Sequence, residues 1–200
     1  MGVFLILNEA KKYFANIAHQ IYQKGLTPGK SGNISTRILI KEYFDDEIIF
    51  ITPSGVSLRD LNTDNIIVTD LNGVKLEGDG QPSSELNMHL TIYRSRRDVK
   101  AIIHTHSTYA TGFSFSDKKI PRLEGYGEIK EPHIPDVKYA TPGSDELVHL
   151  ASSGLKNSDM LILKKHGVVA VGPDLDEALL LSEFTESCAK IGFITHLLNK

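Results

Sequence analysis

Apolar residues near the start of the chain recur at the spacing of an α-helix. Six of them would line one face of it: Ile6, Ala10, Tyr13, Phe14, Ile17 and Ile21. Gly25 follows this run, and a glycine just past the last turn is a common way for a helix to end. The pattern therefore predicts an amphipathic helix that stops near Gly25.

The next part of the chain changes to short β-branched runs. A Gly- and Ser-rich segment from Thr27 to Ser35, which we interpret as a turn, precedes strands predicted at Ile48–Thr52 and Ile66–Thr69. Asn72-Gly73 is a hairpin turn signal before a further strand at Val74–Leu76. These strands are expected to be antiparallel.

Helices and strands are interspersed in the second half. Ser83-Ser84-Glu85 opens a helix whose inward side chains are Leu86, Leu90 and Tyr93. Further elements are predicted as follows: a strand at Val99–His106, a helix capped by Ser144, strands at Met160–Leu163 and Val168–Val171, and a last helix capped by Asp174. No linker or internal repeat interrupts the pattern. We expect a single α/β domain over residues 1–200, with a sheet that is not purely parallel.

Composition and charge exclude several classes of protein. The 200 residues contain 22 Lys and Arg against 25 Asp and Glu, so no basic surface favours nucleic acid as a partner. The longest apolar stretch near the start, Val3–Leu7, is too short to span a membrane, and no basic cluster precedes it as in a secretory signal. Cys188 stands alone, which excludes an internal disulfide and any cysteine-based metal site. A cytoplasmic protein without a membrane partner is expected.

Histidine is the remaining metal ligand of interest. His104 and His106 are two positions apart in a predicted strand, so both imidazoles lie on one face. His166, in the turn before a glycine, is the best third ligand, and three histidines with one open position describe a catalytic zinc site. The spacing alone leaves a second interpretation open, in which the pair is hydrogen-bonded core.

Glu85 is the strongest acid/base candidate, and it could also bind the metal. A carboxylate at the start of a helix is stabilised as the anion, and a nearby cation would tune its pKa further. The alternative is a glutamate that only complements the helix dipole. His89 lies one turn further along the same face, and we interpret it as a residue of the core or of the site's surroundings.

Three Gly- or Ser-containing segments could together bind an oxyanion. They are residues 29–35, residues 52–55 and Ser83-Ser84, and each offers hydroxyl groups or closely approachable backbone amides. Neither the GxxxxGK[ST] nor the GxGxxG phosphate-binding motif is present. A segment of this kind, taken by itself, is more often a turn.

Read in order, six motifs resemble those of the class II aldolase/adducin family. They are GKSGNIS (29–35), TPSG (52–55), PSSE (82–85), HTH (104–106), YATPGSDEL (139–147) and KHGVVAVG (165–172). The resemblance covers about residues 8 to 190. It implies a three-layer α-β-α fold, with a central, largely antiparallel sheet flanked by helices, assembled as a homotetramer with active sites at subunit interfaces.

The resemblance also implies the site. A Zn²⁺ ion would be held by His104, His106 and His166, with Glu85 as acid/base and as fourth ligand when substrate is absent. The substrate phosphate would be bound by Asn33, Ser54, Gly55, Ser83 and Ser84. Tyr126 is a candidate counterpart of a tyrosine that family aldolases use.

The implied activity is reversible cleavage of a ketose 1-phosphate, such as L-fuculose 1-phosphate, to dihydroxyacetone phosphate and a small aldehyde. Two alternatives within the family are a methylthioribulose-1-phosphate dehydratase and a ribulose-phosphate 4-epimerase. Epimerases of the family typically carry Asp where this chain has Glu85, which favours the aldolase. A non-catalytic, adducin-like interaction module is the alternative from another class of protein, but such a module would have no reason to keep the metal ligands.

Overall fold

A computed structural model describes residues 2–39, 47–123 and 131–200. Its centre is one sheet in the order β4-β3-β2-β1-β5-β8-β7-β6, in which every neighbouring pair is antiparallel except β6 and β7. The strands are β1 (Asn33–Ile38), β2 (Ile48–Ile51), β3 (Ile67–Asp70), β4 (Lys75–Glu77), β5 (Ala101–Thr105), β6 (Asp136–Val137), β7 (Met160–Leu163) and β8 (Gly167–Gly172).

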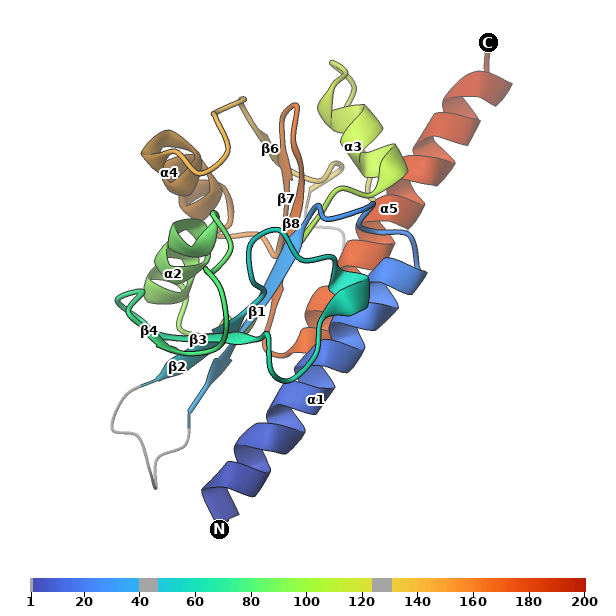
Figure 1. Cartoon of the computed structure of the whole chain (residues 1–200). Helices are drawn as coiled ribbons and strands as arrows, with labels where there is room; N and C mark the ends of the chain where they lie inside the picture. The colour runs from blue at the N-terminus through green and yellow to red at the C-terminus, as the bar shows by residue number, and fades with distance from the viewer. Residues whose placement is uncertain (1, 40–46, 124–130) are drawn as a thin grey trace.

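Helices cover both faces of this sheet. They are α1 (Gly2–Gln23), α2 (Leu86–Ser95), α3 (Thr108–Ser114), α4 (Asp145–Gly154) and α5 (Leu175–Leu198), with a short 3₁₀ helix at Leu58–Asp60. The long helices α1 and α5 lie side by side on one face, and α2 and α4 lie on the other (Figure 1). The expected three-layer α-β-α fold with a largely antiparallel sheet is confirmed.

Cores on both faces of the sheet explain why β2 is apolar at every position. In β2, Ile48 and Phe50 pack into the core under α1 and α5, while Ile49 and Ile51 pack into the core under α2 and α4. The same division separates Ile103 from Ile102 in β5. Successive side chains of a strand point to opposite faces, so a strand covered on both sides needs an unbroken apolar run.

Most of the predicted elements are confirmed; the differences are the unpredicted edge strand β6 and several features near the site. The hairpin at Asn72-Gly73 is present, with Gly73 at φ 85°. The interpretation of residues 27–35 as a turn is wrong in part, because β1 already begins at Asn33. The helix α3 after β5 was not predicted. Glu85 is the N-cap of α2 and not a residue inside its first turn, and its carboxylate makes no capping hydrogen bond.

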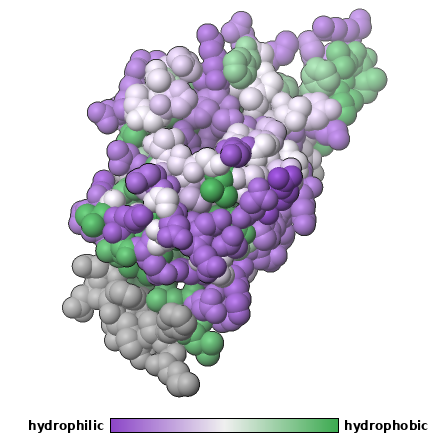
Figure 2. Space-filling view, viewed as in Figure 1, coloured by the Kyte–Doolittle hydropathy of each residue, from purple (hydrophilic) through white to green (hydrophobic). Residues whose placement is uncertain are grey.

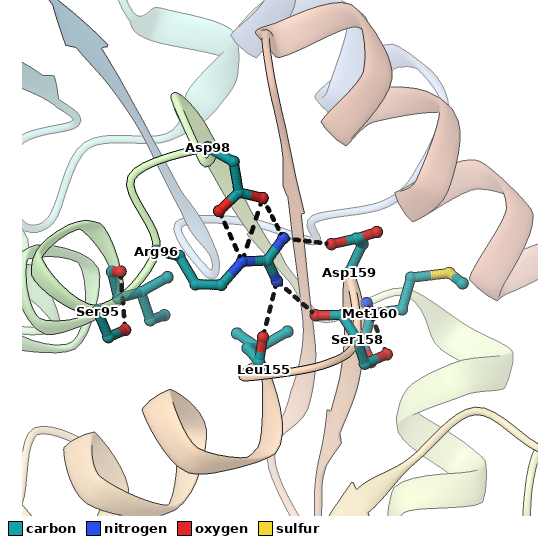
Figure 3. Close-up of polar contacts among 8 residues, drawn as sticks. Ser95, Arg96, Asp98, Leu155, Ser158, Asp159 and Met160 are labelled. Atoms are coloured by element: carbon teal, nitrogen blue, oxygen red, sulfur yellow. Dashed lines mark hydrogen bonds and ion pairs between the residues drawn. The ribbon is translucent and has the colours of Figure 1, made fainter.

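Arg96, at the end of α2, connects three elements on the side of the sheet that α2 covers. Its guanidinium donates to the carbonyl oxygens of Leu155 and Ser158, at 2.8 and 3.2 Å, and to the carboxylates of Asp98 and Asp159 (Figure 3). Leu155 is the C-cap of α4, so a cation here also offsets the negative end of that helix. The two carboxylates raise the pKa of Arg96 further above its usual value.

The surface carries apolar side chains on its two long helices. The C-terminal end of α5 is the clearest example in Figure 2, and its exposed residues are Ile191, Phe193, Ile194, Leu197 and Leu198. On α1, Leu5, Ile6 and Tyr13 are exposed as well. Among the described residues, no helix is long and apolar enough to cross a membrane.

Candidate metal centre and active site

His104 is fully buried in β5 and is held in one tautomer. Its Nδ1 lies 2.8 Å from the carbonyl oxygen of Val168 on the paired strand β8. Because a carbonyl oxygen only accepts, Nδ1 carries the hydrogen and the lone pair of Nε2 is left for another partner. A second hydrogen bond of this kind is how proteins orient histidines that bind metals.

His106 and His166 complete a triad around that lone pair. The three imidazole rings lie 4.7 to 5.0 Å apart between centroids, and their ligand nitrogens all lie within 4.8 Å of one another. The Nε2 atoms of His104 and His106 are only 2.9 Å apart. Burial lowers the pKa of His106 to about 3 and that of His166 to about 4, which favours the neutral form that can coordinate a metal.

The Glu85 carboxylate faces the same point. Its Oε2 lies 3.2 Å from Nε2 of His104, and its Oε1 lies 3.6 Å from Nε2 of His166. Burial by itself raises the pKa of this carboxyl group, but His104, the Asn33 amide and His166 together lower it to about 2. Glu85 is therefore an anion at neutral pH, beside the imidazole nitrogens of His104 and His166.

These residues fit a divalent cation. Glu85 Oε1 is buried and has no hydrogen-bond donor among the described residues. Imidazole nitrogens that turn lone pairs toward one another repel unless a proton or a cation lies between them. Three neutral histidines and one carboxylate are a donor set that zinc accepts readily, and cobalt, manganese and iron accept it too.

Two glycines allow the backbone to pass close to His104. A Cβ at Gly167 would lie 2.4 Å from the carbonyl oxygen of Thr105 and 3.3 Å from Cε1 of His104. A Cβ at Gly32 would lie 2.6 Å from the carbonyl oxygen of His104, and Gly32 also has a positive φ of 73°. Any larger residue at either position would displace β5, the strand that carries His104.

Buried hydrogen bonds connect β1 to α2. They join alternate residues of the strand to residues spaced four apart along the helix. Nδ2 of Asn33 donates to Oε2 of Glu85 at 2.9 Å. Two residues on, Oγ of Ser35 lies 2.6 Å from Nδ1 of His89 and 2.7 Å from the hydroxyl of Tyr93. The strand period of two and the helix period of nearly four keep these pairs in step. This polar ladder fixes Glu85 against the sheet.

The three Gly- and Ser-containing segments meet beside Glu85. The amide of Thr52 donates to the carbonyl oxygen of Ile34, and the amide of Ser83 donates to that of Thr52. Pro53 and Pro82 form an isolated antiparallel bridge. The predicted convergence of these segments is therefore present, although which of their residues would bind phosphate stays a prediction.

The five predicted phosphate residues differ in their exposure and contacts. Ser54, Gly55 and Ser84 are exposed, whereas Ser83 is buried and its Oγ accepts from the amide of Glu85. Gly143 of the YATPGSDEL motif lies against Ser84, since a Cβ there would be 3.5 Å from the carbonyl oxygen of Ser84. The amide of Asn33 is occupied by Glu85.

Tyr126, the remaining predicted residue, lies outside the described residues. Sequence reasoning missed two features of the site, the carbonyl oxygen of Val168 and the contact between Asn33 and Glu85. Both depend on β5 pairing with β8 and with β1. The chain order alone carries no signal for these pairings.

Comparisons with known proteins show what the whole chain is similar to. Residues 12–193 match the Class II Aldolase and Adducin N-terminal domain. An L-fuculose phosphate aldolase of Methanococcus vannielii is 40% identical over 189 residues, 94% of this chain and 98% of that protein. A solved L-fuculose 1-phosphate aldolase superposes with a TM-score of 0.82 at 31% identity, covering 93% of this chain and 85% of that one.

A relative that breaks a different bond is also similar. The 3-oxo-tetronate 4-phosphate decarboxylase of Haemophilus influenzae is 32% identical over 188 residues, 92% of this chain and 86% of that protein. Each of these relatives is named for a phosphorylated sugar or sugar acid. The reactions in their names are aldol cleavage and decarboxylation.

Proposed function

Because the chain belongs to the class II aldolase and adducin family, we propose that it is a zinc-dependent aldolase that cleaves a ketose 1-phosphate. The products would be dihydroxyacetone phosphate and a small aldehyde, in a reversible reaction. The observation that carries this proposal is the buried Glu85 carboxylate, which faces the imidazole nitrogens of both His104 and His166. L-fuculose 1-phosphate is the first substrate to test, since the relative at 40% identity is named an L-fuculose phosphate aldolase and the solved structure at 31% identity an L-fuculose 1-phosphate aldolase.

In this proposal His104, His106 and His166 hold the ion, with Glu85 as a fourth ligand until substrate arrives. When bound, a dication supplies electrostatic stabilisation of the negative charge that develops on the substrate oxygens as carbon–carbon cleavage proceeds. The tautomer that Val168 imposes on His104 keeps one ligand nitrogen facing the ion without any rearrangement.

Glu85 is the residue that transfers a proton to and from C3 of the substrate. As the C3–C4 bond breaks, the C4 hydroxyl loses its proton to water or to a second base, for which Tyr126 is a candidate, and the bonding pair remains on the C2–C3 fragment. Glu85, after taking up a proton from water, protonates C3 of that fragment, and in the synthetic direction it removes the same proton and returns it to water. The hydrogen bond from Asn33 holds the carboxylate in place for both steps.

The phosphate end of the substrate would lie over the joined segments at Ser54-Gly55 and Ser83-Ser84, with Asn33 at their inner edge. Hydroxyl groups and backbone amides can hold a phosphate without a basic surface. Binding energy from this unreactive end would orient C3 and C4 at Glu85. This explains how a chain with a net charge of −3 could take an anionic substrate.

A second candidate function is decarboxylation of a phosphorylated 3-oxo acid. The similarity to the 3-oxo-tetronate 4-phosphate decarboxylase favours it. Loss of CO₂ from such an acid also leaves negative charge on the carbon next to a carbonyl group, so the same residues would serve. The dehydratase and 4-epimerase of the family remain alternatives. A non-catalytic module is disfavoured, because such a protein has no use for a buried anion among three histidines.

Product analysis separates these reactions. Metal-replete protein would be incubated with a panel of ketose 1-phosphates and a 3-oxo acid phosphate. The assays would follow dihydroxyacetone phosphate, CO₂, dehydrated product and epimer. We expect dihydroxyacetone phosphate from at least one ketose 1-phosphate. A Glu85→Gln variant purified in parallel controls for contaminating aldolase, and the absence of carbon–carbon cleavage from every ketose phosphate would refute the assignment.

Metal analysis tests the cofactor separately. Protein purified without chelator is expected to contain zinc, and His166→Ala is expected to lose it. His149→Ala, which changes an exposed histidine of α4, is the matched control and is expected to keep it. Equal metal content in the two variants would contradict a centre at His166.

We also propose that residues 1–200 form one domain that assembles as a homotetramer with active sites at subunit interfaces. The apolar side chains exposed on α1 and α5 support association, because burying them removes apolar surface from water. Light scattering on purified protein would test the tetramer. We expect the protein to act in the cytoplasm, since charged sugar phosphates do not cross a bilayer readily.

A further inference from the structure

The three histidines of the proposed metal centre are not supported equally by the sheet. His104 lies within β5, where its backbone pairs with β1 and β8. His106 lies just beyond the end of β5, and His166 lies just before the start of β8. Strand pairing therefore fixes the first ligand, whereas the other two lie outside the paired strands, where their backbone amides donate to the carbonyl oxygens of Leu26 (from His106) and Leu163 (from His166).

The short helix α3 contacts the chain at both of these positions. It begins two residues after His106. At its other end, the carbonyl oxygen of Ser114 accepts from the amide of Lys165, at 3.0 Å, directly before His166. Lys165 has a φ of 56°, which few residues other than glycine adopt, so this contact stabilises an unusual turn. One helix thus joins the segments that carry His106 and His166.

A helix of seven residues is not stable by itself, and α3 lacks the usual cap. The side chain of its N-cap residue, Ser107, makes no capping hydrogen bond. Glu186 of α5 takes that place from a distant part of the chain. Its Oε1 accepts from the amide of Tyr109 and its Oε2 from that of Ala110, both at 2.9 Å. A carboxylate also complements the positive end of a helix.

We infer that Glu186 is a positioning residue for the metal centre. By holding the N-terminus of α3 with both carboxylate oxygens, it fixes the separation of His106 and His166, although it touches neither histidine. This inference rests on the metal centre proposed above. Metal coordination tolerates only about 0.2 Å of error in ligand distances, so a small shift of α3 is enough to weaken it.

Cobalt titration of the metal-free, full-length protein tests this role. Co²⁺ accepts the same donors as zinc, and its visible absorption reports the geometry of the ligands. Glu186→Ala is expected to weaken Co²⁺ binding by about tenfold, the lower end of the effect of removing a supporting residue, and to alter the absorption band. Glu186→Gln keeps one acceptor oxygen and is expected to fall between Glu186→Ala and wild type.

The matched control is Glu183→Ala on the same helix. Glu183 pairs with Lys24 at 3.1 Å, so this change removes a carboxylate from α5 without removing the Glu186 cap of α3. It is expected to bind Co²⁺ as the wild type does. Circular dichroism of each metal-free variant establishes that it is folded. If Glu186→Ala does not fold, the same titration of Glu186→Gln decides.

Two other results would distinguish failure of the positioning role from failure of the metal centre. A folded Glu186→Ala protein with wild-type Co²⁺ affinity and spectrum would overturn the positioning role and leave the metal centre in place. If the wild type and His166→Ala bound Co²⁺ equally, the metal centre itself would be refuted, and the role of Glu186 with it.

Discussion

The side-chain amide of Asn33 donates a hydrogen bond of 2.9 Å to the carboxylate of Glu85, 52 residues further along the chain. This bond uses Oε2 and leaves Oε1 without a donor among the described residues. A buried oxygen in that state is unfavourable unless a ligand or a cation satisfies it. The contact therefore both orients the carboxylate and leaves one of its oxygens available.

The Glu85→Gln variant should fold as the wild type does but lose most of its catalytic activity. A glutamine can still accept the hydrogen bond from Asn33, but it cannot carry a proton to or from carbon. We expect kcat to fall by at least about 100-fold, with zinc content and KM close to wild type. Steady-state kinetics on the substrate found in the product screen would measure this. Glu9→Gln, an exposed carboxylate of α1, is the control, and substantial turnover by Glu85→Gln would exclude the acid/base role.

Ser35→Ala should lower the free energy of unfolding by more than the loss of a single hydrogen bond would. The hydroxyl of Ser35 serves both His89 and Tyr93, and all three residues are fully buried. Its loss leaves two buried polar groups without this partner, at about 1 to 3 kcal/mol for a buried group left unsatisfied. Urea unfolding would measure the change. Thr36→Ala, on the other face of β1, should cost less, and equal losses would argue against the polar ladder.

Gly167→Ala and Gly112→Ala should have opposite effects. The new methyl group at Gly167 would meet the carbonyl oxygen of Thr105 at 2.4 Å, so β5 and β8 must move apart. The same change at Gly112 meets nothing within 4 Å, and alanine is better than glycine in a helix by about 1 kcal/mol. The midpoint temperature of thermal unfolding and the zinc content should both fall for Gly167→Ala, and neither should fall for Gly112→Ala. A stable Gly167→Ala protein with full zinc content would contradict the close packing at the triad.

Stability of the metal-free protein should fall as the pH drops below about 6.5. Burial lowers the pKa of His89 to about 3, so the unfolded chain binds a proton near pH 6.5 that the folded chain does not accept. The stabilisation is present above pH 6.5 and is lost between pH 6.5 and 3, at up to about 1.4 kcal/mol per pH unit for one such group.

The variant His89→Asn isolates this contribution. Asparagine offers a polar atom near the position of Nδ1, toward Ser35, but it does not titrate. Urea unfolding at pH 7, 6 and 5 should show a shallower loss for the variant than for the wild type. Parallel pH profiles would mean that His89 does not contribute. His106 and His166, whose pKa values are also lowered, supply the loss that remains in the variant.

Periodicity identified the outer helices, the hairpin and the apolar strands, because these depend on local spacing and on burial of one or both faces. Gly25, predicted as a helix end, has the positive φ of a C-terminal cap. The sequence did not reveal β1 at Asn33, because its first residues are polar. Asn33 and Ser35 are buried through hydrogen bonds to α2, and a hydropathy pattern interprets such residues as surface.

The triad could be predicted from spacing only up to its first pair. His104 and His106 share a face by the period of a strand, and their rings do meet. His166 joins them because β5 pairs with β8 in a register that places Thr105 beside Val168. That pairing follows from the order of strands in the sheet, which periodicity could not predict. His166 was proposed from its place in a turn before a glycine, and the motifs of the family strengthened that interpretation. Glu186 was missed entirely, since its partners are backbone amides.

The strand order also determines when the site can form during folding. Asn33 reaches Glu85 across 52 residues, and His104 reaches Val168 across 64. Closing such long loops costs entropy that only a nearly complete sheet repays, so the three imidazoles converge late. On the ribosome, a chain that has not yet reached His166, directly before β8, holds two of the histidines and no centre. Uptake of a metal ion by the triad would thus mark a chain that has finished folding.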